Sequence, residues 1–366
     1  MKILYITNGV SGPGGLERVL SIKASYLADT MNYDIHFLTL NKLSDELFYT
    51  FSDAITFHNI IASGNPIQYF LKYRRGIAKV ISKIKPDVIS VCDDGLKGLF
   101  LPLIINKPCP MIYERHVSKN ISIKKDKLSI IQKSTSWLLF KFMDFGAKFY
   151  DRFVVLTNGN TKEWDLNNKL VIPNPLSFYP PTEEISTLTN KKVLAVGKQS
   201  FQKGYDRLLQ SWSIVQTTHP DWELDIYGTI SEKEALPELA KALKIESSVN
   251  FYAPVKNIAA KYKEASLYVM SSRYEGFGMV LTEAMAYGVP CVSFDCPYGP
   301  SDIISNHHDG ILVPNHDTTA LAHGMVSLMN DAQRRTEMGE MARVNVKRYL
   351  IEEIAVQWDN LFKSLK

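Results

Sequence analysis

The chain has 366 residues, of which 45% are apolar and 22% charged, and its formal net charge is +4. This length suits about two domains of ~100–200 residues, and the composition is typical of a globular protein with large cores. Nucleic-acid-binding proteins normally carry a strongly basic stripe, which this weak charge does not suggest. We therefore expect no nucleic-acid partner.

Signals for export and membrane insertion are weak. The N-terminal apolar run ends at a turn at Asn8-Gly9. This run is too short for the apolar region of a signal peptide. No stretch approaches the ~20 apolar residues of a membrane span. The four cysteines form no C-x-x-C pair and lie in or beside apolar runs, which predicts buried, reduced thiols. We expect a cytoplasmic protein that can still contact the inner membrane surface.

The first half of the chain alternates predicted strands and helices. An apolar run over Lys2–Thr7 leads into a glycine-rich turn and then a helical pattern, the opening of a βα unit. A later helix is predicted over Tyr69–Ile84. Further strands are predicted over Tyr33–Leu40, Asp53–Ile61, Val88–Val91, Met111–Tyr113 and Phe153–Leu156.

The same alternation restarts near residue 190, after two proline-rich stretches, Ile172–Leu176 and Tyr179–Thr182, that suit a linker. A helix is predicted over Tyr205–Gln216. Two runs of βα units predict an α/β protein of two doubly wound, Rossmann-like domains, with the active site in the cleft between them. The strands of the second half are predicted over Lys192–Val196, Glu223–Tyr227, Val249–Tyr252, Leu267–Met270, Val289–Phe294 and Ile311–Val313.

A glycine-rich turn in the second half carries the most informative residues. Glu275 precedes Gly276-Phe-Gly278, and a helix is predicted to start at Met279 and Val280. Glycines allow close approach of a ligand, and a helix start offers free N–H groups to anionic oxygens. Glu275 and Glu283 could each accept two hydrogen bonds from sugar and ribose hydroxyls. If only their spacing is considered, it is more common for one such glutamate to cap a helix and for the other to be solvated.

A second loop directly follows the first strand of the C-terminal half. Lys198 and Lys203 lie there between Gly197 and Gly204. A bound diphosphate needs cationic donors, and flexible lysines supply point charges. The alternative is that Lys203 is an exposed turn residue.

Together these segments resemble the retaining GT-B glycosyltransferases of the family-4-like group, which includes sucrose synthase-like and bacterial polysaccharide enzymes. The matching motifs are E-G-F-G with E-x7-E, A-M-A-x-G-V-P, G-K-x-x-x-x-K-G and I-P-N-P. The resemblance extends from Gly14-Gly15 to Asp309–Pro314. It implies an acceptor-binding domain over residues 1–172, a nucleotide-sugar-binding domain over residues 173–344, and a helix at about 345–366 that packs back on the first domain.

The resemblance also implies roles for single residues. Glu275 would contact hydroxyls of the transferred sugar and Glu283 the ribose, while Lys198 and Lys203 would neutralise the departing diphosphate. Lys198 matches a position that is more often arginine, and a lysine loses the planar two-pronged geometry.

In the first half, Gly14-Gly15 would let the loop approach the diphosphate and acceptor. His116 would reach the sugar near the reacting carbon, although a lone histidine at a strand end is more often structural. The predicted catalytic residues are Glu275, His116, Lys203 and Lys198, and the predicted donor-binding residues are Gly14, Gly15, Gly197, Asn174, Gly276, Phe277, Gly278, Met279, Val280 and Glu283.

The donor and the mechanism follow from the same resemblance. Asp295–Pro300 reads D-C-P-x-G-P, which is similar to bacterial members that use UDP-N-acetylhexosamine or UDP-galactose-like donors. N-acetylgalactosamine is the first choice of sugar. No D-x-D triplet occurs, so lysines and a helix dipole would replace a metal ion, and we expect no cofactor. Retention would follow from same-face attack, with the departing phosphate taking the acceptor proton.

Two basic segments bear on the identity of the acceptor substrate. The segments Lys119–Lys148 and Tyr69–Lys85 are basic and apolar-backed, so they could lie on an anionic bilayer or form solvated faces. Membrane contact would fit a polyprenyl-diphosphate-linked or other lipid-anchored glycan.

Three other functions compete with a transferase. A nicotinamide dehydrogenase is disfavoured because residues 9–15 do not form G-x-G-x-x-G and the second strand lacks a ribose-binding carboxylate at its end. The two glutamates and paired lysines argue against a UDP-sugar epimerase of the same fold. A non-catalytic sugar-binding protein would usually be exported.

Overall fold

The computed structural model describes residues 1–41, 46–93, 95–122 and 129–366. The chain divides into two compact units. Of the described residues, those within Met1–Lys119, 129–177 and Ile351–Lys366 form the first unit, and those within 120–122 and Phe178–Leu350 form the second. After Ser177 the chain passes into the second unit, between the two proline-rich stretches and a few residues after the predicted boundary at 172/173. Helix α13 (Ile351–Ser364) belongs to the first unit.

The described part of the first unit contains a parallel seven-stranded sheet in the order β3-β2-β1-β4-β5-β6-β7. The central strands are buried on both faces, which explains why they read as continuous apolar runs. The short strand β7 was not predicted, because it is partly exposed and lacks such a run. The strands are β1 (Lys2–Thr7), β2 (Asp34–Leu40), β3 (Thr56–Ile60), β4 (Val88–Cys92), β5 (Met111–Glu114), β6 (Arg152–Val155) and β7 (Lys169–Val171).

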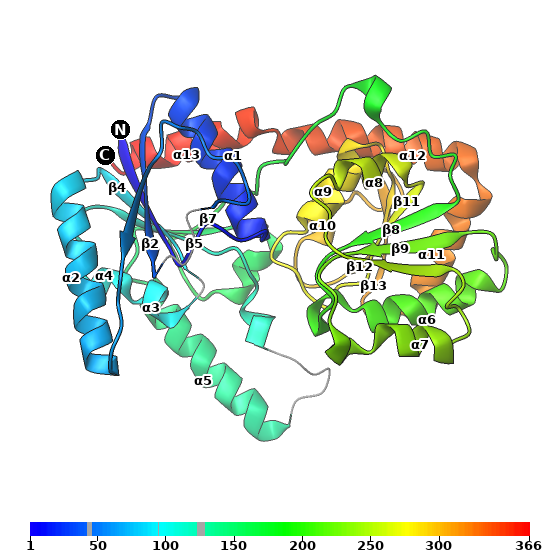
Figure 1. Cartoon of the computed structure of the whole chain (residues 1–366), viewed down its shortest axis with the longest axis horizontal. Helices are drawn as coiled ribbons and strands as arrows, with labels where there is room; N and C mark the ends of the chain where they lie inside the picture. The colour runs from blue at the N-terminus through cyan, green and yellow to red at the C-terminus, as the bar shows by residue number, and fades with distance from the viewer. Residues whose placement is uncertain (42–45, 94, 123–128) are drawn as a thin grey trace. The chain divides into compact units, whose positions relative to one another are not determined.

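Helices cover this sheet. Helix α2 (Pro66–Ile84) begins at an Asn65 cap with proline in its first turn, two start signals that stabilise a helix end. Helix α13 lies against α1 (Gly15–Asp29), as the red and blue helices of Figure 1 show. The remaining helices of this unit are α3 (Leu96–Leu99), α4 (Leu101–Ile104) and α5 (Ile130–Ala147).

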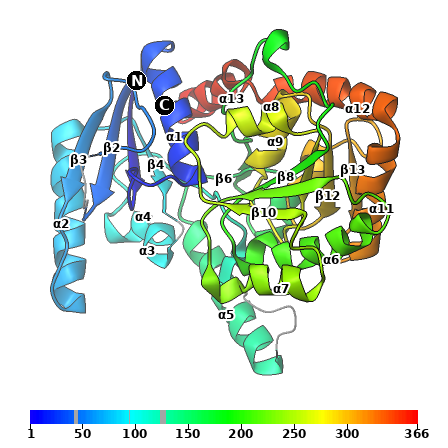
Figure 2. The same ribbon diagram turned by 45° about the vertical axis from the view of Figure 1, so that its right-hand side comes forward.

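The second unit repeats the plan with a parallel six-stranded sheet in the order β10-β9-β8-β11-β12-β13. Helices α6 and α7 lie on one face of this sheet and α8 and α9 on the other (Figures 1 and 2). The strands are β8 (Lys192–Val196), β9 (Glu223–Tyr227), β10 (Val249–Tyr252), β11 (Leu267–Met270), β12 (Cys291–Asp295) and β13 (Gly310–Pro314). The helices are α6 (Tyr205–Gln216), α7 (Leu236–Ala242), α8 (Ala259–Glu264), α9 (Met279–Ala286), α10 (Pro300–Ile303), α11 (Thr318–Asn330) and α12 (Ala332–Asn345).

Both sheets therefore have the doubly wound Rossmann-like topology that was predicted. The strand order reverses between β1 and β4 in the first sheet and between β8 and β11 in the second. Ligands of such folds bind beyond the carboxyl ends of the strands at these switch points. The loops after β1, β8 and β11 are three of the segments in which site residues were predicted.

Two smaller expectations have different outcomes. Among the described residues, no helix combines the length and the apolar character that crossing a bilayer requires. Cys92, Cys291 and Cys296 are buried, as predicted, but Cys109 is only partly buried, contrary to the prediction for this residue.

Candidate active site

In the second unit, the loops after β8 and β11 are held in direct contact. Gly204 has a φ of +62°, and a Cβ built there would lie 2.3 Å from the carbonyl oxygen of Ser271. A side chain at this position would therefore force the loops apart. The Ser271 hydroxyl also donates to the carbonyl of Lys203 at 2.9 Å. These two contacts hold the backbone of Lys203 against the loop after β11.

An arginine that the sequence analysis missed clamps the same two loops. Arg273 donates to both carboxylate oxygens of Asp206, at 2.8 and 2.7 Å, and to the carbonyl of Phe201 at 2.9 Å. Its guanidinium also lies 4.1 Å from the centroid of the Phe201 ring. Such two-pronged pairing fixes orientation as well as distance. The only signal in the sequence was an arginine two residues before Glu275.

The clamp brings together two residues that were predicted to act in catalysis. Lys203 Nζ lies 2.7 Å from Glu275 Oε1, and the Ser272 hydroxyl donates to the same oxygen at 2.6 Å. A Cβ built on Gly197 would lie 2.8 Å from Lys203 Cε, so the lysine stem packs directly on this glycine. Lys198 is exposed and forms no ion pair among the described residues.

The start of α9 offers backbone donors next to Glu275. Gly278 precedes the helix with a φ of +104°, and Met279 and Val280 are partly exposed while the following residues are buried. The first N–H groups of a helix have no acceptor within it and carry partial positive charge. Gly276 and Phe277 form the buried turn before this point. The helix thus starts at the predicted residue, and the binding of an anion there stays a prediction.

Glu283 lies deeper in the second unit than the predicted ribose contact requires. It is 1% exposed, and the Tyr262 hydroxyl donates to its Oε2 at 2.9 Å. In this conformation the carboxylate offers almost no surface to a ligand. Its role in ribose binding stays a prediction.

In the first unit, His116 follows β5 and belongs to a buried polar cluster. Its Nε2 lies 3.1 Å from Glu114 Oε2, which also binds Lys23 Nζ at 2.5 Å. The Ser90 hydroxyl donates to Glu114 Oε1 at 2.6 Å. Burial acts to raise the pKa of Glu114, but Lys23 and then His116 more than offset this and lower it to about 2. The carboxylate is therefore ionised at neutral pH.

Part of this cluster brings possible metal-binding atoms close together. One ligand atom each of Cys92, Glu114 and His116 lies within 4.8 Å of the others. Both Glu114 oxygens, however, already accept hydrogen bonds, one of them from an ammonium group. A metal ion would have to displace Lys23, so the residues present fit a metal poorly.

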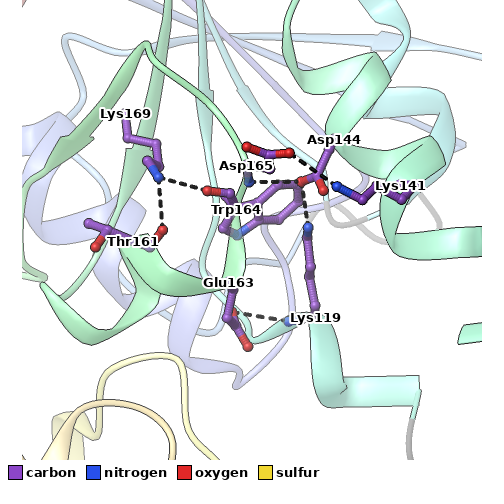
Figure 3. A network of polar contacts seen from close by, with 8 residues as sticks. All are labelled: Lys119, Lys141, Asp144, Thr161, Glu163, Trp164, Asp165 and Lys169. Carbon is purple, nitrogen blue, oxygen red and sulfur yellow. Dashed lines mark hydrogen bonds and ion pairs between the residues drawn. The ribbon is translucent and has the colours of Figure 1, made fainter. Parts of the chain in front are cut away.

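The segment after His116 is tied to the rest of the first unit by a second buried network (Figure 3). Lys119 Nζ lies 2.5 Å from Asp144 in α5 and 4.1 Å from the centroid of the Trp164 ring. The Lys119 amide donates to Glu163 at 3.3 Å, and the Ser118 hydroxyl also donates to Glu163. Lys119 is thus buried and does not contribute to the basic face predicted for residues 119–148. Within that face, Lys124, Lys125 and Lys127 lie outside the described residues.

The predicted glycines of the first unit have ordinary backbone conformations. Gly14 has a φ of −76°, which any residue adopts, and Gly15 begins α1. A Cβ at Gly14 would lie 2.4 Å from a carboxylate oxygen of Glu17. A diphosphate at this helix start would meet that negative charge unless Glu17 turned away. Asn174 is buried in the stretch that leaves this unit.

Two doubly wound units form the fold of the GT-B glycosyltransferases, and the second unit has a lysine–glutamate pair and a helix start at its switch point. The sequence model of the family described as "Glycosyl transferases group 1" matches residues 182–345. These residues are a domain of that family, and the chain is a glycosyltransferase.

Relatives of similar length agree with this class. An uncharacterized glycosyltransferase of Haemophilus influenzae is 28% identical over 98% of this chain and 99% of its own. The amylovoran biosynthesis glycosyltransferase AmsD of Erwinia amylovora is also 28% identical, with the same coverage. A TarM mutant of S. aureus, solved with Fondaparinux, alpha-GlcNAc-glycerol and UDP, has a TM-score of 0.79, 16% identity and 99% coverage of both chains. At that identity the likeness shows the fold alone.

Proposed function

We propose that the chain transfers a hexose or N-acetylhexosamine, with N-acetylgalactosamine as the first choice, from a UDP-sugar to a glycan in cell-surface polysaccharide synthesis. The observation that carries this proposal is the Lys203–Glu275 pair beside the start of α9. It places a cation, a carboxylate and free backbone donors within one pair of loops. A sugar diphosphate requires this combination, because it presents anionic oxygens and hydroxyls together.

In the proposed complex, Lys203 exchanges part of its contact with Glu275 for oxygens of the diphosphate. The N–H groups of Met279 and Val280, together with Lys198, add positive charge to the same group. Glu275 then accepts hydrogen bonds from hydroxyls of the sugar. Positive charge on the leaving group stabilises the transition state, so these residues would serve without a metal ion.

The proposed reaction retains the anomeric configuration. The acceptor oxygen attacks the anomeric carbon from the face that the diphosphate leaves. As the new C–O bond forms, the bond between that carbon and the diphosphate oxygen breaks. The acceptor proton passes to a phosphate oxygen, so no further base is needed. The name of the amylovoran relative and the UDP in the TarM complex support the substrate class.

An apolar stripe on α5 supports a lipid-linked acceptor, such as a polyprenyl-diphosphate-linked glycan, at the cytoplasmic face of a membrane. Five large apolar side chains of this helix are each at least 50% exposed. Lys133, Lys141 and Lys148 on the same helix are also exposed. Exposed apolar and cationic side chains together favour the surface of an anionic bilayer. The apolar side chains are those of Ile131, Trp137, Leu138, Phe142 and Phe145.

Co-sedimentation with vesicles tests this surface. Wild-type protein should sediment with vesicles that contain anionic lipid, and Leu138→Asp/Phe142→Asp should not. Val344→Asp/Val356→Asp, at two exposed apolar side chains of α12 and α13, adds the same negative charge away from both basic segments and is the control. Equal sedimentation of wild type and the α5 variant would contradict the membrane assignment.

Binding and product analysis test the chemistry. UDP should stabilise the protein in a thermal-shift assay, whereas GDP, ADP and NAD should not. With the right UDP-sugar and an acceptor, UDP should be released and NMR should show a glycosidic bond of unchanged anomeric configuration, with or without EDTA. An epimerase would instead alter the UDP-sugar without an acceptor. Inversion, or loss of activity in EDTA, would contradict the mechanism.

A further inference from the structure

A buried chain of contacts in the first unit runs from α1 to His116. Lys23, Glu114 and His116 have side chains that are 1%, 1% and 5% exposed. Glu114 Oε2 lies between the Lys23 ammonium, at 2.5 Å, and His116 Nε2, at 3.1 Å. The carboxylate therefore connects a buried charge to the histidine ring.

This arrangement determines which ring nitrogen carries a hydrogen. An ionised carboxylate only accepts hydrogen bonds, so His116 Nε2 must donate to Glu114. In the neutral ring, Nδ1 is then the acceptor. His116 Nδ1 is buried and has no hydrogen-bond partner among the described residues. A buried acceptor of this kind is unfavourable until a ligand supplies a donor.

We propose that Lys23 and Glu114 are positioning residues that hold His116 in its Nε2–H form, so that Nδ1 accepts a hydrogen bond from a hydroxyl of the sugar substrate. The inference rests on the proposed function for the identity of the ligand. Lys23 and Glu114 do not touch substrate themselves. Lys23 keeps Glu114 ionised, and Glu114 sets the orientation and hydrogen placement of the ring.

The C-terminal helix completes the surroundings of Lys23. The ring centroid of Trp358, in α13, lies 3.8 Å from Lys23 Nζ, and that of Tyr5, in β1, lies 5.0 Å away. Aromatic faces attract a cation and keep water from it. The ionisable groups facing the cluster thus come from α1 (Lys23), β1 (Tyr5) and β4 (Cys92), and each one packs around Glu114 or His116.

The substitution Lys23→Met tests the proposal at a distance from the histidine. Methionine keeps the apolar volume but removes the ammonium, so burial should leave Glu114 protonated at neutral pH. A protonated carboxyl can donate its hydrogen to His116 Nε2, which then becomes the acceptor. The ring should switch from the Nε2–H form to the Nδ1–H form. Two-dimensional NMR of histidine-labelled protein reports this form through the ¹⁵N shifts, assigned with His116→Gln.

Two variants serve as controls. Glu114→Gln should keep the Nε2–H form, because the amide oxygen can accept from both Lys23 and His116 while the amide nitrogen donates to Ser90. Lys107→Met removes a lysine from a partly exposed ion pair with Asp151 in the same unit. It should leave the His116 signals and the activity unchanged. If Lys23 had only a structural role, His116 would keep the Nε2–H form in both Lys23→Met and Lys107→Met.

The NMR spectrum of the wild-type protein tests the proposal even if Lys23→Met does not fold. An Nδ1–H form of His116 in the wild-type protein would overturn the proposal, as would an unchanged Nε2–H form in folded Lys23→Met. In activity assays, Lys23→Met should lower kcat about tenfold with little change in the KM for the UDP-sugar, as expected for one lost hydrogen bond. Because the ring form is measured without substrate, absence of transferase activity would contradict only the proposed function.

Discussion

Each unit contains a lysine–glutamate pair of similar length, but the two pairs differ in access. Lys23 and Glu114 are 2.5 Å apart and each 1% exposed, whereas Lys203 and Glu275 are 2.7 Å apart and 18% and 8% exposed. The first pair is enclosed by Ser90, His116 and aromatic rings, and the second lies in loops at the carboxyl edge of a sheet. The two pairs therefore differ in their access to solvent and hardly in their distance, and we expect the enclosed pair to stabilise the fold and the more accessible one to serve a ligand.

The physical reason lies in desolvation. An enclosed pair has lost its water on both sides, so removing one member leaves a buried charge that nothing compensates. Lys203 keeps some contact with solvent and Glu275 keeps the Ser272 hydroxyl as a second partner, so less would be left uncompensated if an anionic ligand took over the lysine.

The largest effect is expected for Glu114→Ala, which leaves the Lys23 ammonium buried without a counter-charge. The free energy of unfolding should fall by about 3–5 kcal/mol. Urea unfolding, with hydrogen exchange of β5 to locate the change, measures it. Asp165→Ala, which breaks the exposed pair with Lys141, is the matched control and should change stability by less than about 1 kcal/mol. A similar small loss for Glu114→Ala would show that the enclosed pair is not needed for the fold.

The opposite pattern is expected for Glu275→Gln in the second unit. Transfer should slow by about 10²–10³ in kcat, because a contact to the reacting sugar is lost, while the fold remains intact. Steady-state kinetics and circular dichroism measure the two quantities. Glu264→Gln, in a surface pair with Lys261, should leave both unchanged. Full activity in Glu275→Gln would remove this residue from the proposed site.

Stability should also depend on pH through Glu114. Its pKa is lowered from 4.5 to about 2 in the folded protein, so the carboxylate contributes stability that is fully present above about pH 4.5 and lost as pH falls toward 2. The shift corresponds to about 3 kcal/mol. Urea unfolding between pH 6 and 2 should show this loss, and Glu114→Gln should lack it. Parallel curves for the two proteins would contradict the assignment.

The smallest effect is expected for Arg273→Lys, which keeps the charge but loses the two-pronged pairing with Asp206. The loops that hold Lys203 and Glu275 should become less well positioned. We expect kcat/KM to fall about tenfold, equivalent to ~1.4 kcal/mol, with secondary structure unchanged. Arg152→Lys, at an exposed arginine of the first unit, is the control. An effect of equal size in both variants would contradict a positioning role for Arg273.

Local patterns in the sequence predict the two sheets and several candidate site residues of the second unit. Strands such as β8 and β11 lie within the predicted bounds because buried parallel strands are continuous apolar runs that end at turn residues. Gly197, Lys203 and Glu275 could be singled out because each lies just beyond such a strand, where the topology gathers ligand-binding loops. Local patterns carry this information, since a strand and the loop after it are neighbours in the chain.

Which side chains contact one another became clear from the packed fold and not from the sequence. Lys23 and Glu114 are 91 positions apart, and Arg273 and Asp206 are 67 apart. In neither pair does the sequence around one residue indicate its partner. The enclosure of Glu283 by Tyr262 and the approach of Glu17 to Gly14 likewise depend on how helices and loops pack. The burial of a charge and the partner that compensates it are properties of packed elements, so a single sequence shows the candidates while the fold selects the pairs.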